Sequence, residues 1–382
     1  MRRKIALPGG DNLKTVDFGF LLITLILVAF GLVMVFSASY YSSISVNGTP
    51  FYYLIRDGIW VCAGLIMMFI GMTLDYRNYK KLALPIMLAC LAALVLVLVI
   101  GATRNGATRW LAVGPITFMP GEWAKLGMVF FLAWFFGEKP VRARSILLGI
   151  LPAVIVTAGF AFLIIRQPNL STALTVCGIA VAMMLVAGMD WAYVGAAAGL
   201  GVGGFLFIVL FMKDTYWYAR ITNFTDPFQD MYGEGYQVAQ SLLALGSGGL
   251  TGVGLGRSVQ KSLYLPEPQN DFILAIIGEE LGFIGVIVLL IVYCLLIWRG
   301  MRIALRAPDQ FGMLLASGVV MMVAIQVILN VAVVTASMPA TGINLPFISY
   351  GGNGLLMFMF SAGVLLNISK QETRIREAES GG

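Results

Sequence analysis

Long apolar runs recur along nearly the whole sequence, and they limit the possible folds more than any other feature. A helix needs about 20 apolar residues to cross the hydrocarbon core of a bilayer, which is about 30 Å thick. Runs near this length occupy residues 17–38, 52–74, 80–101, 122–137, 145–165, 168–188, 190–212, 271–298, 308–336 and 345–369. The sequence therefore predicts an all-α polytopic integral membrane protein with about ten transmembrane helices. It divides into a segment 1–16, a transmembrane domain 17–369 and a tail 370–382.

The composition excludes several classes of catalytic site. Of all residues 59% are hydrophobic and 12% are charged, whereas soluble domains carry about 25% charged residues. The sequence contains 0 histidines, which removes Ser-His-Asp and Cys-His catalytic groups and histidine metal sites. The 4 cysteines lie inside apolar runs at no ligand spacing, so we expect neither disulfides nor a cysteine metal site. Acid–base chemistry must then use carboxylates, lysine, tyrosine or water.

Basic residues gather in alternate connections between the apolar runs and form no patch of the kind that binds nucleic acid. They cluster around positions 2–14, 77–81, 139–144, 299–306 and 370–376. Because connections rich in Lys and Arg stay on the cytoplasmic side, both termini are predicted to be cytoplasmic. The long, aromatic-rich segment 213–270, between the seventh and eighth spans, then lies on the outer side, where we expect it to form short helices on the bundle.

Other basic residues break this charge rule and fall toward the predicted outer side. They include Arg104, Arg109, Lys125, Arg166, Lys213, Arg220, Arg257 and Lys261. Such residues either bind an anionic ligand or are ordinary solvated loop residues. The string GLGRSVQK at 254–261 places two of them four apart after glycines. Backbone N–H groups and cations could hold a diphosphate there, and a flexible solvated loop is the alternative.

Asp271 lies where a polar loop enters an apolar run, in the string YLPEPQNDFILAIIGEELG. Partial removal from water at that depth raises the pKa of a carboxyl group and makes it a plausible general base. The alternative is a helix N-cap, since Asp is a favoured cap residue. Glu267 lies on the same loop, where solvation is its simplest interpretation.

Glu122 and Lys125 lie three residues apart at the start of the fourth span, so they share one helix face. Charged pairs inside a membrane are costly and usually functional, although a structural salt bridge is the alternative. Arg109 and Trp110 precede them in the outer loop. Arginine binds phosphate through two parallel hydrogen bonds, whereas Trp110 is equally well interpreted as an interfacial anchor.

Pro and Gly surround the expected start of the last span in MPATGINLPFISYGGNGL at 338–355. Interrupted helices at membrane depth are tolerated where they line a cavity. Gln326 and Asn330, inside the ninth span, could face that cavity or form hydrogen bonds between helices.

Taken together, these strings resemble the SEDS family (shape, elongation, division and sporulation), and its FtsW/SpoVE branch more than RodA. The resemblance extends over roughly residues 16–370. It rests on GATRWL, PGEWAK, QPNLSTAL, DPF followed by GYQVAQSLLALGSGGLTGVGLGRSVQK, LPEPQNDFILAIIGEELG and TGINLPFISYGG, in this order. The chain departs from the commonest family pattern at three positions, with Gly121, Asn169 and Asn353 where Ser, Asp and Ser are usual.

The resemblance implies a peptidoglycan glycosyltransferase of the bacterial cytoplasmic membrane that polymerises lipid II on the outer face. It also implies a class B penicillin-binding protein as partner. The family's essential aspartate falls on Asp271, its charged helix motif on Glu122 and Lys125, and its loop arginine on Arg109.

Polymerisation needs a base for a sugar hydroxyl and cations for the departing lipid diphosphate. We therefore expect Asp271 to be the base. The expected diphosphate ligands are Arg109, Lys125, Arg220 and Lys261. No protein metal site is predicted, although a divalent cation, Mg²⁺ or Mn²⁺, could assist and contact Asp271 or Glu267. Two other functions stay open on the residues alone: a flippase for a lipid-linked precursor, and a non-catalytic scaffold of the cell-wall synthesis complex.

Overall fold

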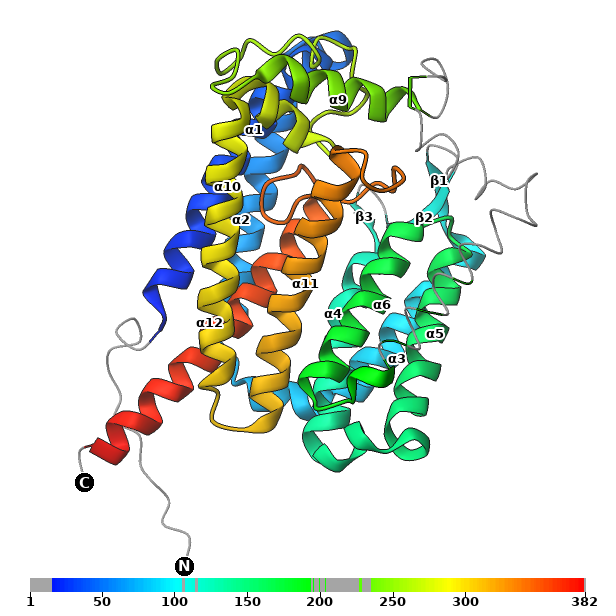
Figure 1. Cartoon of the computed structure of the whole chain (residues 1–382), viewed down its shortest axis with the longest axis vertical. Helices are drawn as coiled ribbons and strands as arrows, with labels where there is room; N and C mark the ends of the chain where they lie inside the picture. The colour runs from blue at the N-terminus through cyan, green and yellow to red at the C-terminus, as the bar shows by residue number, and fades with distance from the viewer. Residues whose placement is uncertain are drawn as a thin grey trace, which may run out of the picture.

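The computed structural model is a bundle of long helices with a cap of shorter elements at one end (Figure 1). It describes residues 16–104, 107–113, 116–193, 195, 199, 203, 227–228 and 235–380. Seven of the described helices are long and apolar enough to cross a membrane, and a shorter apolar helix accompanies them. The predicted class, an all-α polytopic membrane protein, is therefore confirmed.

Nine of the ten expected spans coincide with helices in the described part of the chain. These helices are α1 (Phe18–Asn47), α2 (Tyr52–Thr73), α3 (Tyr76–Ile100), α4 (Pro120–Glu138), α5 (Leu151–Ile165), α6 (Leu170–Val186), α10 (Ile273–Leu305), α11 (Gln310–Val334) and α12 (Gly352–Ser380). The seventh expected span, 190–212, falls largely outside the described residues. A 3₁₀ helix, Pro140–Arg144, and a π-helical turn, Ile146–Ile150, join α4 to α5.

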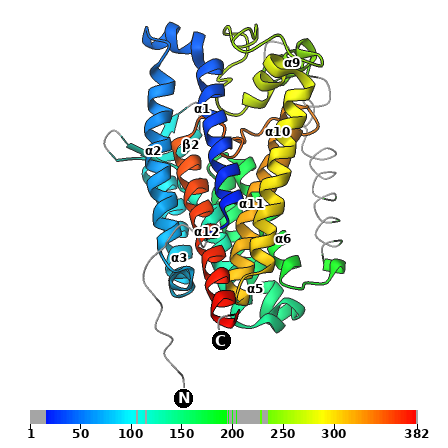
Figure 2. The same ribbon diagram turned by 90° about the vertical axis from the view of Figure 1, so that its left-hand side faces the viewer.

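The helix α9 (Tyr236–Gly248) lies across the end of the bundle opposite the C-terminus, and we call this end the α9 end (Figures 1 and 2). Three short antiparallel strands lie between α3 and α4: β1 (Ala102–Arg104), β2 (Ala107–Val113) and β3 (Ile116–Phe118). The sequence interpretation treated them only as a loop.

The last expected span begins later than the apolar pattern suggests. Residues 345–351 form turns, and α12 begins only at Gly352. The main-chain N–H of Tyr350 donates to the oxygen of Gln269 at 2.9 Å. This apolar but non-helical stretch is buried against other protein elements, which is the condition under which a membrane protein tolerates it.

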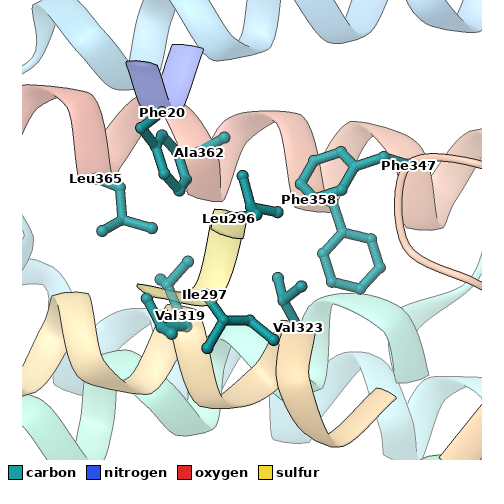
Figure 3. A pocket seen from close by; sticks show the side chains of 10 residues that line it. Phe20, Leu296, Ile297, Val319, Val323, Phe347, Phe358, Ala362 and Leu365 are labelled. Carbon is teal, nitrogen blue, oxygen red and sulfur yellow. The ribbon is translucent and has the colours of Figure 1, made fainter. Parts of the chain in front are cut away.

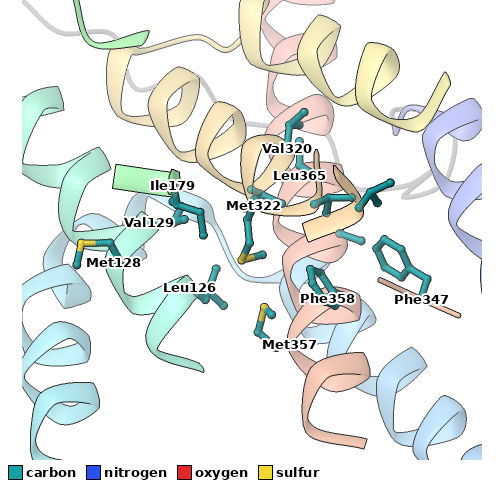
Figure 4. Packing of buried hydrophobic residues seen from close by; sticks show 14 of the residues in the cluster. Leu126, Met128, Val129, Ile179, Val320, Met322, Phe347, Met357, Phe358 and Leu365 are labelled. Atoms are coloured by element: carbon teal, nitrogen blue, oxygen red, sulfur yellow. The ribbon is translucent and has the colours of Figure 1, made fainter. Parts of the chain in front are cut away.

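The centre of the bundle is packed by apolar side chains of α4, α6, α11 and α12 (Figure 4). Helix α12 approaches α2 closely, because Gly363 faces Met68 and a Cβ at position 363 would lie 2.1 Å from the Met68 carbonyl oxygen. Small residues permit such close backbone contact in membrane proteins. A small apolar pocket adjoins this packed centre and is lined by side chains such as Phe20, Leu296 and Phe347 (Figure 3). Its lining contains no ionisable side chain, so the chemistry has to be sought elsewhere.

Candidate functional site

Asp271 lies at the α9 end, directly before α10, and is half-buried. It is not the helix cap, because Phe272 occupies the N-cap position and no side chain caps this helix. Its carboxylate faces Gly342, where a Cβ would lie 3.0 Å from Oδ2. The carboxylate is therefore free from a structural capping role and lies against bare backbone.

The side-chain amide of Asn330 holds the backbone on both sides of this contact. It donates to the main-chain oxygen of Asp271 at 2.9 Å and to that of Ile343 at 2.5 Å. One residue of α11 thus binds the loop that carries the aspartate to the loop that carries Gly342. These partners lie in loops, so neither expected alternative applies exclusively: Asn330 connects α11 to two loops rather than to another helix.

Burial and the charges of β2, α4 and its own loop act on Asp271. Together they raise the pKa of its carboxyl group from 3.8 to about 6: burial is the largest cause, negative charge on Glu267 and Glu122 adds to it, and Arg109 opposes them. A carboxylate of this kind is largely ionised at neutral pH yet basic enough to accept a proton. The structure therefore brings together four of the predicted site residues: Asp271, Glu267, Glu122 and Arg109.

Glu122 and Lys125 form the expected pair, with 2.8 Å between Oε2 and Nζ. Lys125 is buried and also donates to Oε1 of Gln326 at 2.8 Å. Gln326 in turn donates to the main-chain oxygen of Asn344 at 3.0 Å. The charged pair of α4 is thereby connected to the same 342–344 segment that faces Asp271, so its structural and functional interpretations are compatible.

Arg109 lies on β2 and binds the connection between α5 and α6. Its Nε donates to the main-chain oxygen of Gln167 at 3.2 Å, and its guanidinium also donates to Pro168. Asn169 caps α6 by accepting from the N–H of Thr172 at 3.2 Å. Asparagine caps a helix as well as aspartate does, so this departure from the family pattern preserves the cap. Trp110, the next residue on β2, is half-buried beside Ala102 of β1.

Lys261 belongs to a second buried cluster. Its Nζ lies 2.6 Å from Oε1 of Glu280 and donates to Ser37 of α1 at 3.0 Å. Both charged side chains are buried. These two partners already engage the Lys261 ammonium group. Its expected role in holding a diphosphate stays a prediction.

The glycine-rich segment before Lys261 is bound to α10 rather than loose. Gly282 interrupts α10 with a φ of 70°, and the N–H of Val253 donates to the freed oxygen of Glu279 at 2.9 Å. The Glu279 carboxylate accepts from Ser258 and from the N–H of Val259, the latter at 2.8 Å. These hydrogen bonds hold the segment against α10, while Leu255, Gly256, Arg257 and Val259 are exposed. The diphosphate-binding and solvated-loop interpretations of this segment therefore both stay open.

Arg220 lies outside the described residues. Within the described part of the chain, no three carboxylate or cysteine side chains come together that could hold a metal ion. Contact of a divalent cation with Asp271 or Glu267 stays a prediction, and the chemistry proposed below assigns no step to it.

Sequence reasoning missed several uncharged residues at this end of the bundle. Gln269, Thr341 and Tyr350 all lie beside Asp271 or its neighbours in the chain. Ser37 completes the Lys261 cluster from α1. Neutral side chains give no charge signal in a sequence. Gln269 and Thr341 could have been noticed only because they lie in LPEPQNDFILAIIGEELG and TGINLPFISYGG, two of the strings that resemble the family.

A family model described as cell cycle protein, covering FtsW, RodA and SpoVE, matches residues 18–374. The chain belongs to this family. It is 42% identical over 356 residues to stage V sporulation protein E of Bacillus subtilis, covering 93% of this chain and 97% of the relative. It is 39% identical to a probable peptidoglycan glycosyltransferase FtsW of Geobacter metallireducens, covering 94% and 96%.

Two solved structures are similar to this fold. One belongs to a peptidoglycan synthase complex described for the structural coordination of polymerization and crosslinking, with a TM-score of 0.78 and 27% identity over 94% of this chain and 98% of that one. The other is the rod shape determining protein RodA of Thermus thermophilus, with a TM-score of 0.68 and 29% identity over 95% and 99%. The resemblance stated from the sequence motifs is therefore confirmed.

Proposed function

We propose that this chain is a peptidoglycan glycosyltransferase that polymerises lipid II, the undecaprenyl-diphosphate-linked disaccharide peptide, into glycan strands. Relatives that share about 40% of the sequence over nearly the full length carry this activity in their names. The observation that carries the proposal is the placement of Asp271. Its carboxylate, with a pKa raised to about 6 by burial, lies among charged groups of β2, α4 and its own loop.

In this proposal Asp271 removes the proton from the 4-hydroxyl of the acceptor sugar. The resulting oxygen attacks the anomeric carbon of the donor, and the bond from that carbon to the lipid diphosphate breaks. The proton remains on Asp271 until solvent removes it, and the bonding electrons leave with the diphosphate. A correctly placed base of this kind contributes on the order of 10²- to 10⁴-fold to the rate.

Negative charge develops on the departing diphosphate, and cations near it lower the barrier. Arg109 acts electrostatically on Asp271. Lys125 is connected through Gln326 to Asn344, close to the Gly342 that faces Asp271. Arg220 and Lys261 complete the predicted set, and Trp110 is proposed to pack on sugar or lipid. Glu122 holds Lys125 in place, and Glu267 keeps the Asp271 carboxyl basic through its negative charge.

We propose further that the α9 end faces the outer side of the bacterial cytoplasmic membrane, with both termini in the cytoplasm. The basic residues support this orientation, because Arg77 lies in the first turn of α3 and Arg142 lies in the 3₁₀ helix before α5, at the end opposite α9. A class B penicillin-binding protein is the proposed partner, and the similarity to a chain of a synthase complex that couples polymerization and crosslinking supports it.

The test is polymerisation of lipid II by the full chain with its partner, in detergent or nanodiscs. Asp271→Asn keeps the shape and removes the base, so we expect a loss of at least about 100-fold. Asp190→Asn is the matched control, because Asp190 is exposed beyond the end of α6. Equal activity of the two variants would show that Asp271 is not the base. Translocation of labelled lipid II without polymerisation would instead favour the flippase, and full cellular function of Asp271→Ala would favour the scaffold.

A further inference from the structure

Several side-chain oxygens close to Asp271 are buried without a hydrogen-bond partner in the described part of the chain. Among them are Oε1 of Gln269 and Oγ1 of Thr341. The two residues are only 2% and 6% exposed. A buried polar atom without a partner costs on the order of 1–3 kcal/mol, and such atoms are rare in folded proteins. Their occurrence in a pair beside the proposed base calls for an explanation.

The backbone brings the segments of both residues together at Asp271. Gln269 precedes Asp271 by two positions, and its main-chain oxygen accepts from the N–H of Tyr350 at 2.9 Å. Thr341 directly precedes Gly342, the residue against which the carboxylate lies. The two residues belong to different loops, and both loops are bound by the amide of Asn330. They therefore lie on the two chain segments that meet at the Asp271 carboxylate.

Asn330 carries a third oxygen of the same kind. Its Nδ2 donates to two carbonyl oxygens, which fixes the orientation of the amide, and its Oδ1 is buried without a partner in the described part. The shared property of the three atoms is that they accept hydrogen bonds. The two amide oxygens can only accept, whereas the Thr341 hydroxyl accepts and also donates. All three atoms are neutral, so a ligand that satisfies the amide oxygens has to bring donors and needs no positive charge.

The need for hydrogen-bond donors distinguishes the sugar end of a lipid-linked sugar from its diphosphate end. A diphosphate has only acceptor oxygens and is suited to cations such as Arg109. A sugar with an acetamido group brings hydroxyl and amide N–H donors. Tyr53 of α2 and Tyr350 lie beside this region with their rings edge-to-face at 5.2 Å and 89°. Tyrosine combines a flat apolar face with a polar tip, which suits the mixed surface of a sugar ring.

We propose that Gln269 and Thr341, supported by Asn330, form a subsite that accepts hydrogen bonds from the hydroxyl and amide N–H donors of the acceptor sugar. This subsite rests on the proposed function and adds the recognition of the sugar whose hydroxyl Asp271 deprotonates. The subsite orients the sugar through neutral contacts, while the cations bind the diphosphate. Gln269 and Thr341 are thus specificity residues.

The first experiment removes the Thr341 hydroxyl with no change of volume. Thr341→Val is expected to weaken the binding of lipid II to the full chain with its partner about three- to tenfold, the usual effect of one neutral hydrogen bond. Thr341→Ser should restore binding. Because the hydroxyl has no partner within the described protein, Thr341→Val should melt at the same temperature as the wild type or higher. A residue with a purely structural role would lower it.

Thr335→Val is the matched control. Thr335 lies at the end of α11, is exposed and already donates to the main-chain oxygen of Val331 at 2.8 Å. Its substitution should leave lipid II binding unchanged. Gln269→Leu should behave as Thr341→Val does.

Lipid II analogues that lack one donor of the terminal sugar then test the contact directly. The analogues are the 3-deoxy sugar, the 6-deoxy sugar and the sugar with O-acetyl in place of the acetamido group. At least one should bind the wild type more weakly, and this penalty should disappear in Thr341→Val or Gln269→Leu. Equal penalties in the wild type and both variants would overturn the subsite. Absence of polymerisation by the wild type counts against the proposed function, whereas the binding measurement needs no turnover and decides the subsite by itself.

Discussion

Asn330 donates its side-chain amide to the main-chain oxygen of Asp271 at 2.9 Å, and the same amide group reaches Ile343 at 2.5 Å. One buried residue of α11 thus sets the distance between the proposed base and the loop opposite it. A side chain that acts in this way positions a catalytic group, so its loss should affect the rate as well as the folding.

Asn330→Leu should lower kcat by at least about tenfold, because misplacement of reacting groups by 1 Å can cost about 100-fold. It should also lower the melting temperature, since two carbonyl oxygens lose their donor. Asn367→Leu is the control: Asn367 is equally buried and also bonds backbone, donating to Met72 at 2.8 Å and accepting from Tyr76 at 2.9 Å. Both variants should lose stability, and only the first should lose kcat. Equal losses of kcat would contradict a positioning role.

The raised pKa of Asp271 predicts a specific pH dependence. The base acts only when ionised, so kcat/KM should fall as pH decreases through about 6, where burial has placed the pKa of this carboxyl. Glu267→Gln removes a negative charge that raises this pKa, so the midpoint of the pH profile should move to lower pH. Lipid II polymerisation measured from pH 5 to 8 checks both statements, and an unchanged midpoint in the variant would contradict the second.

The raised pKa of Asp271 affects stability in the direction opposite to its effect on activity. A carboxyl whose pKa is higher in the folded than in the unfolded protein binds more protons when folded, so its contribution to stability decreases as pH rises from about 4 to about 6. Asp271→Asn should remove this loss. We therefore expect Asp271→Asn to be inactive at pH 7 and yet to melt no lower than the wild type, as measured by thermal unfolding in detergent.

The membrane fold followed from the sequence because apolar run length and the positions of basic residues are strong, local signals. The same signals misplaced the last span: residues 345–351 are apolar enough to be counted as membrane helix, but Tyr350 bonds Gln269 and the chain turns there instead. Tertiary hydrogen bonds of this kind have no periodicity along the sequence. The strands at 102–118 were missed for a related reason, since they are too short to show an alternating pattern.

The charged part of the candidate site was predictable, whereas the neutral part was not. Asp271, Glu122 and Lys125 stand out because ionisable groups are rare in apolar surroundings. Lys261 shows the limit of that argument, because its charge marked it as a ligand for an anion, whereas in the structure its ammonium group pairs with the buried Glu280. Gln269 and Thr341 have no charge, and their interest comes only from burial without a partner, which requires coordinates.

The Lys261–Glu280 pair should be strongly coupled. Removing one member of a buried pair leaves an uncompensated charge and costs about 3–5 kcal/mol, whereas removing both costs less. Lys261→Met and Glu280→Gln should therefore each lower the melting temperature more than the double variant does. Lys80 and Glu138 provide the control pair, at 2.9 Å but with side chains 36% and 43% exposed, where the coupling should stay below about 1 kcal/mol. Additive effects at Lys261 and Glu280 would show that the buried pair is not coupled.

Substitution of Gly342 tests whether the Asp271 carboxylate has to stay at a fixed position. Its φ is +67°, a conformation that costs other residues about 1–2 kcal/mol, and an added Cβ would lie 3.0 Å from Oδ2 of Asp271. Gly48 has nearly the same φ, +70°, but nothing lies within 4 Å of its added Cβ. Gly48→Ala should therefore lose stability alone. Gly342→Ala should lose similar stability and, because the methyl group pushes the carboxylate away, at least about tenfold in kcat. Equal kcat in the two variants would mean that the carboxylate can move without loss of catalysis, which would contradict a fixed base at position 271.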